Sequence, residues 1–127
     1  MTGCVLDASA VLACLQEEPG EEMVRDALPE ALLSAANAAE VVAKLIDRGD
    51  SETLATFLVL SFPCEIVSID ADLGLRAGRL HAATRKNGLS LGDCMCLALA
   101  QREGLPALTA DRAWGSLSLG ITVTLIR

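Results

Sequence analysis

The chain has 127 residues, 52% of them hydrophobic and 21% charged, which suffices for one packed core and leaves too little chain for a second. We therefore expect a single domain over residues 1–127 and no intrinsic disorder. The net charge of −7 is opposite to that of most nucleic-acid-binding proteins, and one Trp and two Phe cannot build a base-stacking surface. The charge argument weakens if several of the acids bind cations, because the remaining surface is then almost balanced.

Cysteine usage and hydropathy indicate where the protein works. The five cysteines are an odd number without CxxC spacing, which indicates buried free thiols in a reducing compartment. We expect neither a secretory leader nor a membrane span, because no apolar run approaches the ~20 residues that a span needs. The sequence therefore predicts a cytoplasmic protein.

In the first half of the chain, apolar runs alternate with segments of helical periodicity. The first run is followed by Val11, Leu12 and Leu15 at the 3.6-residue period, which predicts a strand and then a helix. The same patterns, with turn signals such as Pro19-Gly20, predict strands at 4–6 and 31–34 and helices at 8–15, 23–28, 38–45 and 54–58.

The second half continues this alternation. Residues 94–100 are apolar on all sides and rich in Ala, which favours a fully buried helix between Ser90 and Glu103. We also expect a helix over 73–84 and strands at 65–69, 106–109 and 121–126. Strands connected through helices pair in parallel, so the sequence predicts an α/β fold, with a mostly parallel sheet of four to five strands covered by helices on both faces.

Four acidic residues follow predicted strands or stand in the first turn of the next helix: Asp7, Glu40, Asp93 and Asp111. In a parallel sheet these positions gather at the carboxyl edge, where α/β folds form ligand sites. Each acid alone is explained by helix capping, since Asn37 and Glu40, like Ser90 and Asp93, have capping-box-like spacing and Asp7 suits an N-cap. Four carboxylates at one edge would repel one another without a cation.

The predicted cation is Mg²⁺ or Mn²⁺, because carboxylates without a convergent His or Cys suit hard, oxygen-preferring ions. Such a site activates water and stabilises the leaving oxygen of a phosphodiester. The single His81 lies in an Arg-rich helix and is expected at the surface, and no Ser or Cys has a local base partner for nucleophilic catalysis.

The sequence around these four acids resembles the PIN-domain ribonucleases, and most closely the VapC toxins of toxin–antitoxin pairs. This resemblance extends over the whole chain. Residues 5–10, 37–41, 89–93 and 108–114 are similar to the four acidic motifs of the family, in order and at compatible spacing. One position departs from the pattern, because many relatives have a basic residue after the third acid, where this chain has Cys94.

The resemblance implies a PIN-like three-layer sandwich and a Mg²⁺- or Mn²⁺-dependent endoribonuclease whose catalytic metal ligands are Asp7, Glu40, Asp93 and Asp111. It also implies that the hydroxyl or amide groups of Ser9, Asn37 and Thr109 orient these metal ligands, with helix or turn capping as the alternative role. The implied partners are an RNA substrate, a second copy of the chain in a homodimer, and a VapB-like antitoxin that blocks the site.

Basic residues and apolar excess point to further contacts. Arg85, Lys86 and Arg112 are candidates for a basic rim that contacts RNA, with a solvated helix face as the alternative. The 52% of hydrophobic residues is more than a small core hides, so we expect apolar surface near 23–28 and 54–60 to be covered by another chain.

Two other functions stay open. A Mg²⁺-dependent phosphatase or phosphoaspartyl domain also has an Asp after its first strand, but it would want an acid where Ser9 stands and a Lys after the last strands. A catalytically decayed PIN-like binding module would keep only its partner contacts, and the presence of all four acids argues against it.

Overall fold

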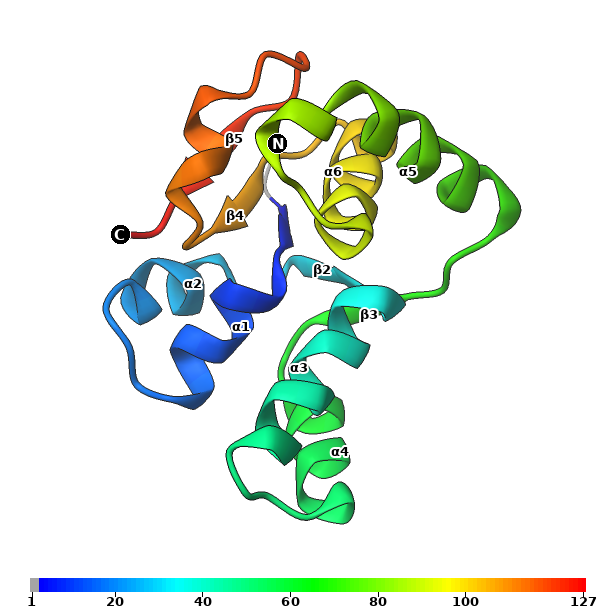
Figure 1. Cartoon of the computed structure of the whole chain (residues 1–127). Coiled ribbons are helices and arrows are strands. Elements are labelled where there is room, and N and C mark those ends of the chain that lie inside the picture. The colour runs from blue at the N-terminus through cyan, green and yellow to red at the C-terminus, as the bar shows by residue number, and fades with distance from the viewer. Residues whose placement is uncertain (1–2) are drawn as a thin grey trace.

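Five parallel strands form the central sheet of the computed structural model, which describes residues 3–127 (Figure 1). They lie in the order β3-β2-β1-β4-β5, and every neighbouring pair is parallel. The strands are β1 (Cys4–Leu6), β2 (Ala31–Ser34), β3 (Glu65–Val67), β4 (Ala107–Thr109) and β5 (Val123–Leu125). The predicted parallel sheet is confirmed, although β3 and β5 are shorter than expected.

Helices pack on both faces of this sheet and give the three layers of the predicted sandwich. They are α1 (Ala8–Leu15), α2 (Glu21–Ala27), α3 (Ala35–Asp47), α4 (Glu52–Ser61), α5 (Ala71–Ala83) and α6 (Leu91–Glu103), with short 3₁₀ helices η1 (Arg85–Asn87) and η2 (Arg112–Ser116). Successive side chains of a strand point to opposite faces of the sheet. Leu6 therefore packs in one core with Leu33 and Val41, whereas Val5 packs in a second core with Leu97 and Trp114.

The buried helix α6 is confirmed, since Cys94 and all five residues from 96 to 100 are buried. Its N-terminus is closed by the predicted capping box, in which Ser90 Oγ accepts a hydrogen bond from the Asp93 amide at 3.0 Å and Asp93 Oδ2 accepts one from the Ser90 amide at 2.9 Å. The helix ends at Gly104, whose φ of 67° is left-handed.

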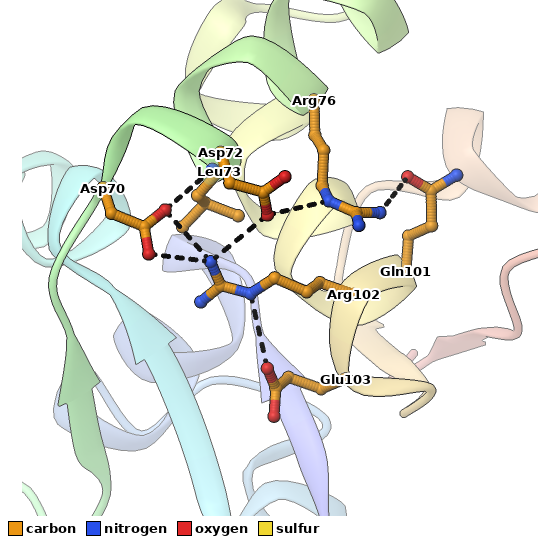
Figure 2. A network of polar contacts seen from close by, with 7 residues as sticks. All are labelled: Asp70, Asp72, Leu73, Arg76, Gln101, Arg102 and Glu103. Carbon is orange, nitrogen blue, oxygen red and sulfur yellow. Dashed lines mark hydrogen bonds and ion pairs between the residues drawn. The ribbon is translucent and has the colours of Figure 1, made fainter.

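An ion-pair network ties the far end of α6 to the start of α5 (Figure 2). Arg102 lies 3.1 Å from Asp70 and 3.6 Å from Asp72, and Arg76 pairs with Asp72 at 3.0 Å. A helix of 13 residues is about 20 Å long, so this network is remote from the N-terminus of α6.

Two simpler expectations can also be compared with the structure. All five cysteines are free thiols, as predicted, and four of them are buried. Within residues 3–127, no helix combines the length and the apolar character needed to cross a lipid bilayer.

Candidate functional site

Asp7 follows the central strand β1 and is almost fully buried, with 5% of its surface exposed. Its Oδ2 accepts hydrogen bonds from Ser9 Oγ and from Thr109 Oγ1, both at 2.8 Å. Each hydroxyl in turn accepts a backbone N–H, Ser9 from Ala110 at 2.9 Å and Thr109 from Asp111 at 3.0 Å. The single proton of each hydroxyl is thereby directed at the carboxylate, which is held between α1 and β4. Asp7 stands at the N-cap position of α1, as the capping alternative predicted, but its side chain makes no capping hydrogen bond, so capping does not explain where this carboxylate points.

Glu40 reaches the same sheet edge from α3. Helix α3 begins at Ala35 and is capped by Ser34, so Glu40 lies in the second turn and the expected capping box of Asn37 and Glu40 is wrong. The amide of Asn37 instead donates to Glu40 Oε1 at 2.8 Å and to the Gly92 carbonyl at 3.1 Å. Ser34 Oγ donates to Asn37 Oδ1 at 2.6 Å. Both Ser34 and Asn37 are fully buried.

Asp93 joins Asp7 and Glu40 from the first turn of α6, and we call these three the carboxylate cluster. Burial is the main cause that raises the pKa of Asp7, and the charge of Asp93 raises it further. Burial likewise raises the pKa of Glu40, with the charges of Asp7 and Asp93 adding to the shift. Because Asp93 acts on Asp7, and both Asp7 and Asp93 act on Glu40, the three acids lie within electrostatic reach of one another.

Asp111, the fourth predicted acid, lies at the rim of the cluster. Its side chain is exposed and caps η2, with Oδ1 accepting the Ala113 amide at 3.0 Å. It connects to Asp7 only through the Thr109 hydroxyl, which accepts the backbone N–H of Asp111 and donates to Asp7. The structure therefore brings three of the four predicted carboxylates together and leaves the fourth beside them.

Sequence reasoning missed two residues of this region. Ser34 is one, because it reads as the last residue of a buried strand, although its cap position before α3 is a recognisable signal. The other is Cys96, a fully buried thiol of α6. Burial, with the charges of all three cluster acids, raises the pKa of this thiol, so it stays protonated beneath the cluster.

The donor chemistry of the cluster fits a hard cation. Within residues 3–127, none of the three carboxylates forms a salt bridge with a basic side chain. The charge of Lys44 lowers the pKa of Glu40, but it is the last of the causes, so burial and the other acids prevail. No group of three or more His, Cys, Asp or Glu in that range is arranged as a preformed metal site. An open set of this kind suits Mg²⁺, which usually retains several waters and binds through one or two carboxylates.

The three predicted RNA-contacting residues are all exposed. Arg85 and Lys86 lie in η1, shortly before the N-terminus of α6, and Arg112 directly follows Asp111. None of the three forms a salt bridge within the described chain, in contrast to Arg76, which pairs with Asp72. Their charges are available to a ligand that approaches this edge.

Solved structures of similar fold include a toxin–antitoxin complex from Klebsiella pneumoniae, with a TM-score of 0.74, 19% identity and 98% coverage of both chains. DNA-bound VapBC from Salmonella typhimurium gives a TM-score of 0.76 at 16% identity over the whole of both chains. VapC20 of Mycobacterium tuberculosis, a Sarcin-Ricin loop cleaving toxin, gives 0.73 at 17% identity, covering 94% of this chain and 98% of that one. At these identities the likeness shows the fold.

Sequence relatives include ribonuclease VapC42 of Mycobacterium tuberculosis and a VapC ribonuclease of Mycobacterium bovis. Each is 29% identical over 114 residues, which cover 82% of this chain and 87% of the relative. The family model named PIN domain matches residues 4–118. With the acidic motifs, the parallel sheet and this match in agreement, the chain belongs to the PIN domain family.

Proposed function

We propose that this protein is a Mg²⁺- or Mn²⁺-dependent endoribonuclease, the toxin of a VapBC-type toxin–antitoxin pair. The observation that carries the proposal is the carboxylate cluster at the carboxyl edge of the sheet. Its three acids form no salt bridge with a basic side chain among the described residues, and burial together with the neighbouring acids raises the pKa of Asp7 and of Glu40. The names of the VapC relatives support the same activity.

In this proposal Asp7, Glu40 and Asp93 bind the cation, and Asp111 at the rim acts as the fourth acid. Ser9 and Thr109 orient Asp7 through the two hydrogen bonds to its Oδ2. Asn37 orients Glu40 in the same way. A bound Mg²⁺ or Mn²⁺ supplies water activation and neutralises the charge that develops on the phosphodiester.

RNA binding in an acidic protein requires local positive charge. We assign this role to Arg85, Lys86 and Arg112, which are exposed, lie shortly before α6 or next to Asp111, and form no salt bridge within the described chain. Contacts of this kind are made to phosphates, so the affinity for RNA should fall as salt rises.

Partner binding belongs to the same proposal. The expected apolar surface is present, since Met23, Leu54, Phe57 and Leu60 are exposed on α2 and α4. We propose that a second copy of the chain and a VapB-like antitoxin cover such surfaces, as is consistent with the toxin–antitoxin complexes among the similar structures. Location in the cytoplasm stays a prediction.

The two alternative functions have less support. A phosphoaspartyl mechanism would want a second carboxylate at position 9, where Ser9 instead donates to Asp7. A decayed module has no need for the hydrogen bonds that orient Asp7 and Glu40, and it would fail to bind Mn²⁺ at the cluster.

The test is Mg²⁺-dependent RNA cleavage by the purified protein and by its Asp7→Asn and Asp93→Asn variants, with Asp47→Asn as the control. Asp47 is an exposed acid at the other end of α3, so it shares the chemical change without the site. We expect cleavage to be abolished in the two cluster variants, with the fold retained by circular dichroism, and to be unchanged in the control. Cleavage at the parental rate by either cluster variant would refute the assignment. If the cluster variants lose cleavage as expected, sequencing of RNA ends after controlled expression identifies the target.

A further inference from the structure

The carboxylate of Glu40 lies directly against the backbone of Gly92 at the start of α6. A Cβ placed on Gly92 would lie 2.7 Å from Glu40 Cδ and Oε2 and 2.8 Å from Oε1, closer than any real Cβ contact. Gly92 has no positive φ, so the backbone does not require glycine there. Glycine is also a poor helix former, so what Gly92 provides is space.

Two buried side chains hold Glu40 in that space. Asn37 donates both amide protons in hydrogen bonds, one to Glu40 Oε1 at 2.8 Å and one to the Gly92 carbonyl at 3.1 Å. The hydroxyl of Ser34 donates to Asn37 Oδ1, and this bond fixes the amide with its nitrogen toward Glu40. A chain of hydrogen bonds therefore runs from the end of β2 to the residue before Asp93.

We propose that Gly92 is a positioning residue of the carboxylate cluster: its missing side chain leaves the room in which Ser34, through Asn37, holds Glu40 beside Asp93 for cation binding. The inference rests on the proposed cation site and adds two residues to it, Gly92 and Ser34. Neither touches the cation in this account, because both act through Glu40.

The first test is Gly92→Ala, with Gly78→Ala as the matched control. Both glycines lie in helices, and a Cβ on Gly78 would meet nothing within 4 Å. Gly92→Ala should fold, because the atoms in its way are the end of a flexible side chain. We expect its Mn²⁺ affinity, measured by titration calorimetry and by electron paramagnetic resonance of free Mn²⁺, to fall about 10- to 100-fold, while Gly78→Ala keeps the parental affinity.

The second test separates capping from positioning. Ser34 and Ser51 cap α3 and α4 in the same way, each accepting the backbone N–H three residues on at 3.1 Å. Only Ser34 also orients an amide at the cluster. Ser34→Ala and Ser51→Ala should both lower the metal-free melting temperature, whereas only Ser34→Ala should weaken Mn²⁺ binding, by about tenfold.

The outcomes distinguish this inference from the ribonuclease proposal. Parental Mn²⁺ affinity in Gly92→Ala would overturn the inference while leaving RNA cleavage by the parental protein as evidence for the enzyme. A parental protein that binds Mn²⁺ but cuts no RNA would refute the ribonuclease and leave the positioning role intact. A parental protein that binds no Mn²⁺ would overturn the inference.

Discussion

Removal of the Thr109 hydroxyl tests how strongly the protein holds its buried carboxylate. Thr109→Val keeps the shape of a fully buried side chain and deletes its hydrogen bond to Asp7 Oδ2. The matched control is Thr84→Val, where a buried hydroxyl donates to a neutral acceptor, the Leu80 carbonyl, at 2.8 Å. The two variants differ mainly in the charge of the acceptor.

The expected magnitudes follow from that difference. A hydrogen bond to a charged group contributes about 1.5–3 kcal/mol and a neutral one about 0.5–1.5 kcal/mol. The Asp111 amide, which also loses its acceptor in Thr109→Val, belongs to an exposed residue and can bond to water. We therefore expect Thr109→Val to lower the free energy of unfolding by about 2 kcal/mol, or the melting temperature by about 6–10 °C, and Thr84→Val to cost about half as much.

The pH dependence supplies an independent check. The Thr109 hydrogen bond lowers the pKa of Asp7, so its loss raises that pKa further above the ordinary value. The folded variant then retains the proton to higher pH, and its deficit in stability grows as pH rises through the folded pKa. Urea unfolding without metal, repeated from about pH 8 down through the acid range in which the protein stays folded, measures this change. A Thr109→Val deficit that is no larger than that of Thr84→Val, or that does not shrink in acid, would refute the reasoning.

Two further predictions concern the charges. The metal-free protein should lose stability as pH rises above the ordinary carboxyl pKa, because the raised pKa values of Asp7 and Glu40 make the folded state bind more protons than the unfolded state. Binding of Mn²⁺ should recover part of this loss and raise the melting temperature. An unchanged melting temperature at saturating Mn²⁺ would contradict the proposed site. Arg102→Gln should lower the free energy of unfolding by about 1 kcal/mol at low salt and by less at high salt, because it removes ion pairs with Asp70 and Asp72. The Mn²⁺ affinity should stay unchanged, since Arg102 lies at the far end of α6. If urea unfolding shows the same loss of stability at every salt concentration, the ion pairs are not its cause.

The sheet could be predicted because its pattern is local and simple. Short apolar runs separated by helical periodicity leave parallel pairing as the natural solution, and the apolar run from 94 to 100 is too rich in Ala for a strand. The strand order, with β1 at the centre, could not be predicted from one sequence, because it is decided by packing between distant elements. The last two strands pair in parallel with only the short η2 between them, where a longer helix would be usual.

The placement of the candidate residues at one sheet edge was predictable from the sequence. Strand ends identify where Asp7 and Thr109 stand, and the structure brings them into contact. The sequence could not show that Asp111 faces solvent, or that Asn37 turns its amide to Glu40 instead of capping α3. Those outcomes depend on side-chain hydrogen bonds across elements, such as the one that Ser34 donates to Asn37.

The contact between Asp7 and Thr109 joins residues 102 positions apart, and it has a consequence for a chain that is still being made. Strand β1 has a partner in β2 early in synthesis, but its other neighbour, β4, is made only after α6. At 5–20 residues per second, the interval between Asp7 and Thr109 is about 5–20 s. Throughout that time Asp7 lacks its Thr109 donor, and for most of it the nascent chain also lacks Asp93, so the cluster and its support form only after α6 and β4 have been translated.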